Sequence, residues 1–253
     1  MNYLIIISLF ILGSILGSFL GCIGYRIPNK IKTTYPPSFC EHCKEKLKWY
    51  MNIPIISYIF LKGKCHYCHK PIGFIYFLSE VLCGILFVTN YLVYGFSMNF
   101  FIGLVLTCIL IVTIVSDFKY YYISDRVIIL GIISLLIILF IFESKIYVFK
   151  SIMYSVIMFG IMYLIKLIGN FIFKRESLGD GDIKLMGVIG LALGLINGFV
   201  SLFIASVIGL IYSFINAKAN KEGIIPFGPF LLIGSLITLY LSNYIVYFID
   251  NLL

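Results

Sequence analysis

Two carboxylates and a lysine, set among glycines, interrupt the apolar second half of this chain. An apolar run directly follows the segment, which comprises Gly179, Asp180, Gly181, Asp182 and Lys184. A charge at mid-membrane costs about 2.5 to 3.5 kcal/mol, so ionisable groups beside hydrocarbon are retained mainly where they do chemistry or line a wet cavity. We therefore interpret one of these aspartates as half of a proteolytic pair, with Asp117 as the other half.

A pair of aspartates can hydrolyse a peptide bond. Two carboxylates about 3 Å apart cannot both ionise, so they share a proton, and the pair can deprotonate a water while it protonates the peptide carbonyl. Asp117 follows the third apolar segment, at an expected helix C-terminus, where the helix dipole disfavours a carboxylate. The alternative is that Asp117 and Asp182 are separate carboxylates at the membrane rim, which cap helices or pair with Lys119 and Lys184.

Four cysteines in the only sizeable polar segment have the spacing of a metal site. Cys40 and Cys43 form one C-x-x-C pair, Cys65 and Cys68 form another, and 21 residues separate the two pairs. Four thiolates suit a closed structural zinc site, and disulfides are disfavoured in a cytoplasmic loop. We expect zinc or a similar metal, with the histidines as neighbours of the site (His42, His66 and His69). The cysteines in apolar segments are expected to be small buried hydrophobes (Cys22, Cys83 and Cys108).

Four further residues carry polar or conformational signals. Glu80 lies inside the second apolar segment, where a structural hydrogen bond is the expected role, with a polar cavity as the alternative. Asp125 precedes an apolar run and is expected to cap a helix. Gly179 and Gly181 permit tight backbone and the close approach of another chain.

Composition places these residues in a membrane protein. Of 253 residues, 61% are hydrophobic and 12% are charged, with a mean hydropathy of +1.07. Both fractions are far from those of a soluble domain. We predict an all-α integral membrane protein with about eight transmembrane helices, approximately at 3–24, 72–93, 98–116, 127–142, 147–168, 184–197, 199–216 and 228–248. Because the sixth segment is short and glycine-rich, seven spans with a re-entrant piece are the alternative.

Basic residues predict the orientation. With the N-terminus outside, all of the 19 lysines and arginines except Lys145 and Lys150 fall in cytoplasmic segments. Lysine and arginine in short loops stay on the cytoplasmic side. The cysteine loop, Asp117 and Asp182 would then lie at the cytoplasmic face. We interpret the net charge of +8 as a result of basic residues that set the membrane orientation and contact anionic lipid, and not as a sign of nucleic-acid binding.

The segments predict three parts of the chain. Residues 1–25 form a first transmembrane helix, which is not a cleavable signal peptide because no basic region precedes it and Tyr25-Arg26 stands where a small-residue cleavage site is expected. Residues 26–71 form a small zinc-stapled cytoplasmic domain. Residues 72–253 form a polytopic membrane peptidase domain.

The order of these motifs resembles the prepilin peptidases, also called type IV leader peptidases, which are bifunctional membrane aspartic proteases and N-methyltransferases. The N-terminal half carries Gly17-Ser18-Phe19-Leu20, Tyr25-Arg26-Ile27-Pro28, the two cysteine pairs with the 47–58 stretch between them, Gly63-Lys64-Cys65, and Tyr76 with Glu80. The C-terminal half carries Asp117, Ile123-Ser124-Asp125, the G-x-G-D-x-K segment at 179–184, and Ile225-Pro226-Phe227-Gly228-Pro229-Phe230. Ser124 replaces the proline of the family's I-P-D, which should loosen that turn.

The resemblance implies a function. Asp117 and Asp182 would be the protease dyad, supported by Asp125, Gly179, Gly181, Lys184 and Glu80. The enzyme would cut prepilins or pseudopilins after a glycine at the cytoplasmic face of the bacterial inner membrane. It would then methylate the new N-terminal amine with S-adenosylmethionine, for which no binding residue is named.

Two rival functions fit part of the same pattern. One is a G-x-G-D intramembrane protease that has no methyltransferase activity. The other is a transporter in which Glu80, Asp117 and Asp182 form a proton or cation pathway.

Overall fold

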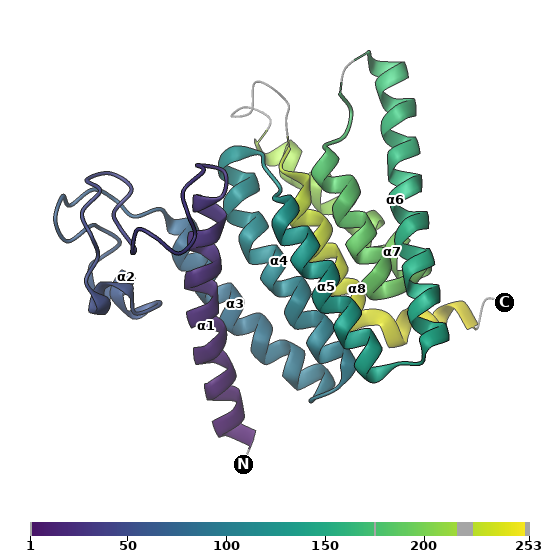
Figure 1. Cartoon of the computed structure of the whole chain (residues 1–253), viewed down its shortest axis with the longest axis horizontal. Coiled ribbons are helices and arrows are strands. Elements are labelled where there is room, and N and C mark those ends of the chain that lie inside the picture. Colours follow the sequence, from purple (N-terminus) through teal and green to yellow (C-terminus); the bar gives the residue numbers. More distant parts are fainter. Residues whose placement is uncertain (1, 175, 217–224, 251–253) are drawn as a thin grey trace. The chain divides into compact units, whose positions relative to one another are not determined.

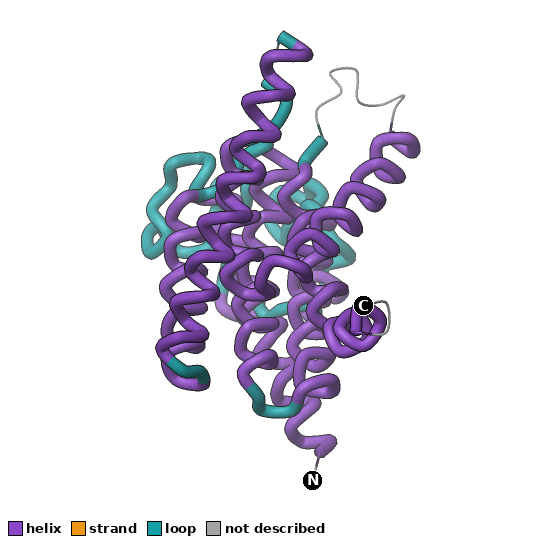
Figure 2. The backbone as a smooth tube through the Cα atoms, turned by 90° about the vertical axis from the view of Figure 1, so that its right-hand side faces the viewer, coloured by secondary structure: helices purple, strands orange, loops and turns teal. Residues whose placement is uncertain are grey.

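The computed structural model describes residues 2–174, 176–216 and 225–250. Within those ranges the chain consists of helices and loops without a strand (Figures 1 and 2). The predicted fold class, an all-α membrane protein with a cysteine-bearing loop after the first helix, is confirmed. Three basic residues used to predict the orientation lie outside the described residues (Arg175, Lys218 and Lys221).

Eight α-helices and one 3₁₀ turn make up the described chain. In order they are α1 (Asn2–Arg26), η1 (Trp49–Asn52), α2 (Ile56–Phe60), α3 (Phe74–Tyr94), α4 (Met98–Tyr120), α5 (Asp125–Phe142), α6 (Lys145–Phe173), α7 (Asp180–Asn216) and α8 (Phe227–Asp250). Six of the described helices are long and apolar enough to cross a membrane, namely α1, α3, α4, α5, α6 and α7. The described apolar part of α8, Phe227–Ser242, is shorter.

A break at Gly194 divides α7. Its backbone there is non-helical, with φ 78° and ψ −173°, a conformation that glycine adopts at little cost. The predicted sixth and seventh segments therefore correspond to two helical halves, with the break three residues before the predicted end of the sixth. The first half, residues 180–193, spans only about 21 Å at 1.5 Å per residue, which is less than the roughly 30 Å of bilayer hydrocarbon.

The chain forms two compact units. The first contains residues 1–95 and 111–122, and the second contains residues 96–110 and 123–253, so that α4 contributes to both. In the first unit α1 packs against α3 (Figure 1). A Cβ added at Gly17 would lie 2.7 Å from the backbone oxygen of Ser79. The small residue at this position lets the two helices pack closely, because a side chain here would collide with the α3 backbone.

The second unit is built on α7, which packs against α5, α6 and α8. Its interior is apolar and tightly covered, with Leu135, Met158, Leu185, Met186 and Leu231 completely buried. Many large apolar side chains on the same helices are exposed, including Phe203 and Leu210 on α7. This distribution is expected for helices that face lipid on one side and other helices on the opposite side.

Candidate active site and metal site

Asp117 lies in the last turn and a half of α4, in the first unit. The residue is only 5% exposed, and its backbone oxygen accepts a hydrogen bond from the Tyr121 N–H at 2.9 Å. Ser116 beside it is also buried. A buried carboxylate at a helix C-terminus is electrostatically unfavourable and is typical of a functional position.

Asp182 lies in the first turn of α7, in the second unit, and is 8% exposed. The positive end of the helix dipole favours a carboxylate in this position. Gly179 precedes the helix, and a Cβ there would lie 3.1 Å from Asp182 Oδ2. A Cβ at Gly181 would lie 2.6 Å from the Cβ of Ile123. The two glycines therefore let this turn close against Ile123 and against the Asp182 carboxylate.

Two ion pairs hold the surroundings of that turn. Lys184 Nζ lies 2.5 Å from Asp125 Oδ1, which ties α7 to the start of α5. Ser124 occupies the N-cap of α5, so Asp125 is the first residue of the helix and not its cap. Asp180, whose side chain is 74% exposed, pairs with Lys166 on α6 at 2.6 Å. The two aspartates of the G-x-G-D motif are thus different in kind, one buried and one at the surface.

The four loop cysteines come together in the first unit. Their sulfur atoms all lie within 4.8 Å of one another, with 3.9 Å between those of Cys40 and Cys68 and 4.0 Å between those of Cys43 and Cys65. A tetrahedral zinc with sulfur at about 2.3 Å requires sulfurs about 3.8 Å apart. The cluster could therefore hold such a metal ion with little movement.

Both cysteine pairs have the same backbone. Cys40 N–H donates to Glu45 O, and Cys65 N–H donates to Lys70 O, at 3.0 and 2.9 Å. A residue with positive φ directly follows each pair, namely Lys44 at 61° and His69 at 55°. Two equivalent turns thus present their thiols to one point, although the sequence around each pair differs.

The Cys65 thiol is acidic. Burial raises its pKa, but hydrogen bonds from the backbone N–H groups of Cys68 and Tyr67 and from the Cys40 and Cys68 thiols together lower the pKa to about 7. A thiol with that pKa is about half ionised at neutral pH. The thiolate is the form that binds a metal.

A charged cluster beside the metal site was not predicted from the sequence. Lys119 Nζ lies 3.2 Å from Glu41 Oε1 and 3.0 Å from the Tyr76 hydroxyl, and that hydroxyl also donates to Glu41. Glu41 stands between the first two cysteines, and Lys119 stands two residues after Asp117. The cluster therefore ties the metal-site loop to the segment of α4 that carries Asp117. The sequence did contain one signal for this cluster, which is the acidic residue Glu41 inside the first C-x-x-C pair.

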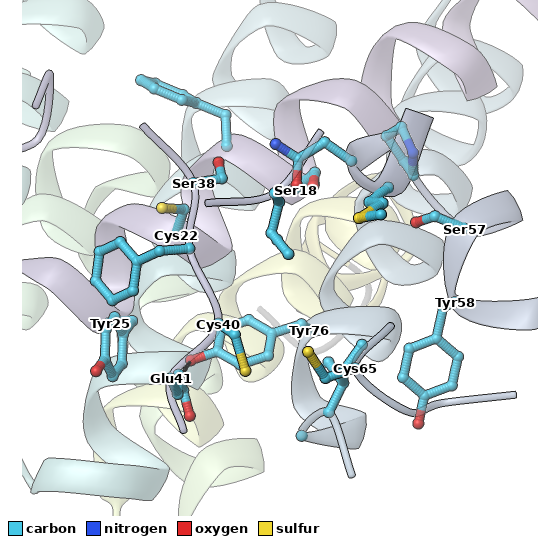
Figure 3. A pocket seen from close by; sticks show the side chains of 18 of the residues that line it. Ser18, Cys22, Tyr25, Ser38, Cys40, Glu41, Ser57, Tyr58, Cys65 and Tyr76 are labelled. Carbon is cyan, nitrogen blue, oxygen red and sulfur yellow. Dashed lines mark hydrogen bonds between the residues drawn. The ribbon is translucent and has the colours of Figure 1, made fainter. Parts of the chain in front are cut away.

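A cavity of about 490 Å³ opens in the first unit between α1, the cysteine loop and α3. Figure 3 shows Ser18 and Cys22 of α1, Ser57 and Tyr58 of the loop, and Tyr76 of α3 around it. Glu80 also lines this cavity and accepts a hydrogen bond from the Ile55 N–H at 2.7 Å.

This combination of features defines a multi-helix membrane protein with a buried carboxylate in each unit and a tetracysteine loop. Residues 11–94 match the bacterial peptidase A24 N-terminal domain, and residues 104–214 match the type IV leader peptidase family. The chain belongs to the type IV leader peptidase family.

Several relatives that match over almost the whole chain are named prepilin leader peptidase/N-methyltransferase. The prepilin leader peptidase/N-methyltransferase of Vibrio cholerae is 30% identical, over 95% of this chain and 98% of the relative. The protein of the same name from Legionella pneumophila is 30% identical over 96% and 92%. The one from Bacillus subtilis is 29% identical over 95% and 96%. No solved structure matches the chain.

Proposed function

We propose that this enzyme removes the leader peptide of type IV prepilins or pseudopilins by cutting after a glycine, and that Asp117 and Asp182 are its catalytic dyad. The observation that carries the proposal is the near full-length match to prepilin leader peptidases from several bacteria. The burial of both carboxylates supports it, because carboxylates removed from water can share a proton at neutral pH.

Each dyad member has a defined task in this proposal. The ionised aspartate takes a proton from a water, whose oxygen attacks the carbonyl carbon of the glycine. The protonated aspartate gives its proton to the carbonyl oxygen. In the resulting tetrahedral intermediate, the aspartate that took the proton from water gives it to the amide nitrogen, and the other aspartate takes a proton from a hydroxyl group. The carbon–nitrogen bond then breaks, leaving the leader with a carboxyl group and the pilin with a new N-terminal amine. The pKa values of such a dyad belong to the pair and not to one residue.

Five further residues support the dyad in this proposal. Gly179 and Gly181 close the turn that carries Asp182, and the Lys184–Asp125 pair holds the start of α7 against α5. Glu80 acts through its hydrogen bond to the cysteine loop.

The cysteine loop is proposed to hold one structural zinc. Cys40, Cys43, Cys65 and Cys68 would be the ligands, since their sulfur separations match a tetrahedral site. A closed site with four protein ligands leaves no open position, so the metal would contribute folding energy to a loop that is too short to have a large core.

We also propose that the enzyme methylates the new N-terminal amine with S-adenosylmethionine. The names of the relatives support this second activity. The methyl carbon passes from the sulfonium sulfur to the neutral amine nitrogen, the sulfur keeps the electron pair of the broken bond, and the nitrogen releases a proton to water. Such a transfer depends mainly on holding the two reactants in line.

The proposal includes a topology and a domain division. The N-terminus lies outside the inner membrane, and the cysteine loop and both dyad aspartates lie at the cytoplasmic face. Residues 1–25 are the first transmembrane helix, 26–71 the metal-bearing domain and 72–253 the peptidase domain. The apolar segment of the prepilin would lie in the bilayer beside the enzyme.

A single assay tests both activities. Purified full-length enzyme is incubated with a prepilin in vesicles and with methyl-labelled S-adenosylmethionine, and leader release and label incorporation are scored separately. We expect cleavage after glycine followed by one labelled methyl group on the new N-terminus. Intact prepilin would contradict the peptidase proposal, whereas cleavage without label would contradict only the methyltransferase proposal.

A further inference from the structure

The cavity in the first unit has the size and walls of a small-molecule site. Its volume of about 490 Å³ falls within the roughly 300 to 1,000 Å³ of typical ligand pockets. Apolar and aromatic side chains form most of the wall, and Tyr58 stacks on Phe77 with ring centroids 4.8 Å apart. A few polar residues, including Ser18, Ser57 and Glu80, line the same space.

The backbone beside Glu80 is strained. Ile55 has φ 63° and ψ −53°, and the Ile56 N–H bonds to Pro54 O at 2.5 Å, so the three residues form a classic γ-turn. That turn is rare and costly, especially for a β-branched residue. The Ile55 N–H donates to the Glu80 carboxylate, which holds the turn in place. Strain of this kind is found at ligand clamps, where surrounding contacts maintain it.

The charged side chains in the cavity wall differ in how many partners they have. Glu41 is engaged by Lys119 and by the Tyr76 hydroxyl, which leaves Glu80 as the carboxylate of the wall that has no ion pair in the described structure. The terminal nitrogens of Arg26 donate to the backbone oxygens of Lys32, Thr33 and Pro36. Its buried Nε has no hydrogen-bond partner in the described structure. The guanidinium of Arg26 is thus enclosed and held by the loop backbone, whereas Glu80 offers the wall an acceptor for a cation.

We propose that this cavity binds S-adenosylmethionine, with Glu80 facing the sulfonium. The inference rests on the methyltransferase part of the proposed function and assigns it a site. A sulfonium cation is attracted by a carboxylate and by aromatic faces. The adenine ring has apolar and aromatic surface available in the same cavity.

Binding is measured by equilibrium dialysis of the purified full-length enzyme with labelled S-adenosylmethionine. Ser18→Phe and Ser57→Phe fill the cavity from two walls, and we expect each to weaken binding tenfold or more. The matched control is Ser8→Phe, on the same helix as Ser18 but exposed and outside the cavity wall. We expect wild-type affinity for this control. Retained zinc, measured by mass spectrometry, confirms that each variant is folded.

A second measurement tests the charge at Glu80. Glu80→Gln keeps a hydrogen-bond acceptor for Ile55 but removes the negative charge. We expect it to weaken binding of S-adenosylmethionine about tenfold, and to weaken binding of S-adenosylhomocysteine much less, because that product has a neutral sulfur.

The outcomes separate the two proposals. Unchanged donor affinity in both phenylalanine variants, or equal effects of Glu80→Gln on the two compounds, would overturn the assigned site. A wild-type enzyme that cleaves prepilin but does not bind the donor would overturn the methyltransferase proposal, and the site with it.

Discussion

Individual residues in the G-x-G-D segment have separable roles. Asp182 is buried at the first turn of α7, whereas Asp180 lies at the surface and pairs with Lys166. Gly181 has no room for a side chain because Ile123 lies against it. The sequence showed two aspartates and two glycines, and only packing distinguishes which aspartate is removed from water.

Gly181→Ala is expected to impair the enzyme. The new Cβ would lie 2.6 Å from Ile123 Cβ, so the first turn of α7 must shift, at a cost of about 1 to 3 kcal/mol. We expect a loss of cleavage activity of at least tenfold together with a lower melting temperature. The matched control is Gly160→Ala in α6, where a Cβ meets nothing within 4 Å. Wild-type activity in Gly181→Ala would show that the turn tolerates displacement.

At the scale of elements, the cysteine loop is organised by its two equivalent turns and anchored to the helices by polar contacts. Glu80 of α3 holds the γ-turn at Ile55, and Lys119 of α4 pairs with Glu41 in the first cysteine turn. The C-x-x-C spacing predicted the cluster of thiols. It could not predict the anchors, because these depend on which helix ends the loop meets in three dimensions.

Removal of single cysteines tests the metal site. Cys43→Ser and Cys68→Ser each take one thiolate from the tetrahedral set, so we expect zinc, near one equivalent per wild-type chain, to fall below a tenth of that value. Cys108→Ser, in the apolar part of α4, should retain the metal. The measurement is metal analysis of the purified protein. Full zinc content in the ligand variants, or disulfides in place of metal, would contradict a tetracysteine site.

The Glu41–Lys119 ion pair connects the loop to the segment of α4 that carries Asp117, so we expect its loss to affect cleavage. Glu41→Gln weakens a half-buried, charge-assisted contact two residues from Asp117, and we expect cleavage to fall about three- to tenfold with zinc retained. Glu45→Gln is the matched control, since this exposed carboxylate in the same turn has no ion pair in the described structure. Equal cleavage rates for the two variants would show that the contact does not affect Asp117.

At the scale of the whole molecule, hydropathy predicted the membrane class and nearly every helix. Two features were less predictable. The predicted sixth segment ends at Asn197 and the seventh begins at Phe199. The observed break lies earlier, at Gly194, where only glycine readily adopts the required φ. The cavity between α1, α3 and the loop was not predicted, because its walls combine residues from three segments, which extend from Ile15 to Glu80.

The predicted topology can be tested with an impermeant maleimide. Ser144, between α5 and α6, is expected outside, and Ser177, between α6 and α7, is expected in the cytoplasm; both are exposed. We expect Ser144→Cys to react in intact spheroplasts, and Ser177→Cys to react only after the membrane is permeabilised. The reverse pattern would contradict the proposed orientation.

The most direct test of the central claim is prepilin cleavage by Asp117→Asn and Asp182→Asn, each purified from the membrane fraction with its zinc content measured. An amide cannot share or transfer the proton as a carboxyl group does, so we predict that both variants insert, retain zinc and fail to release the leader. Asp180→Asn, the exposed aspartate of the same motif, should cleave at close to the wild-type rate. Full processing by either Asp117→Asn or Asp182→Asn would contradict the aspartate dyad.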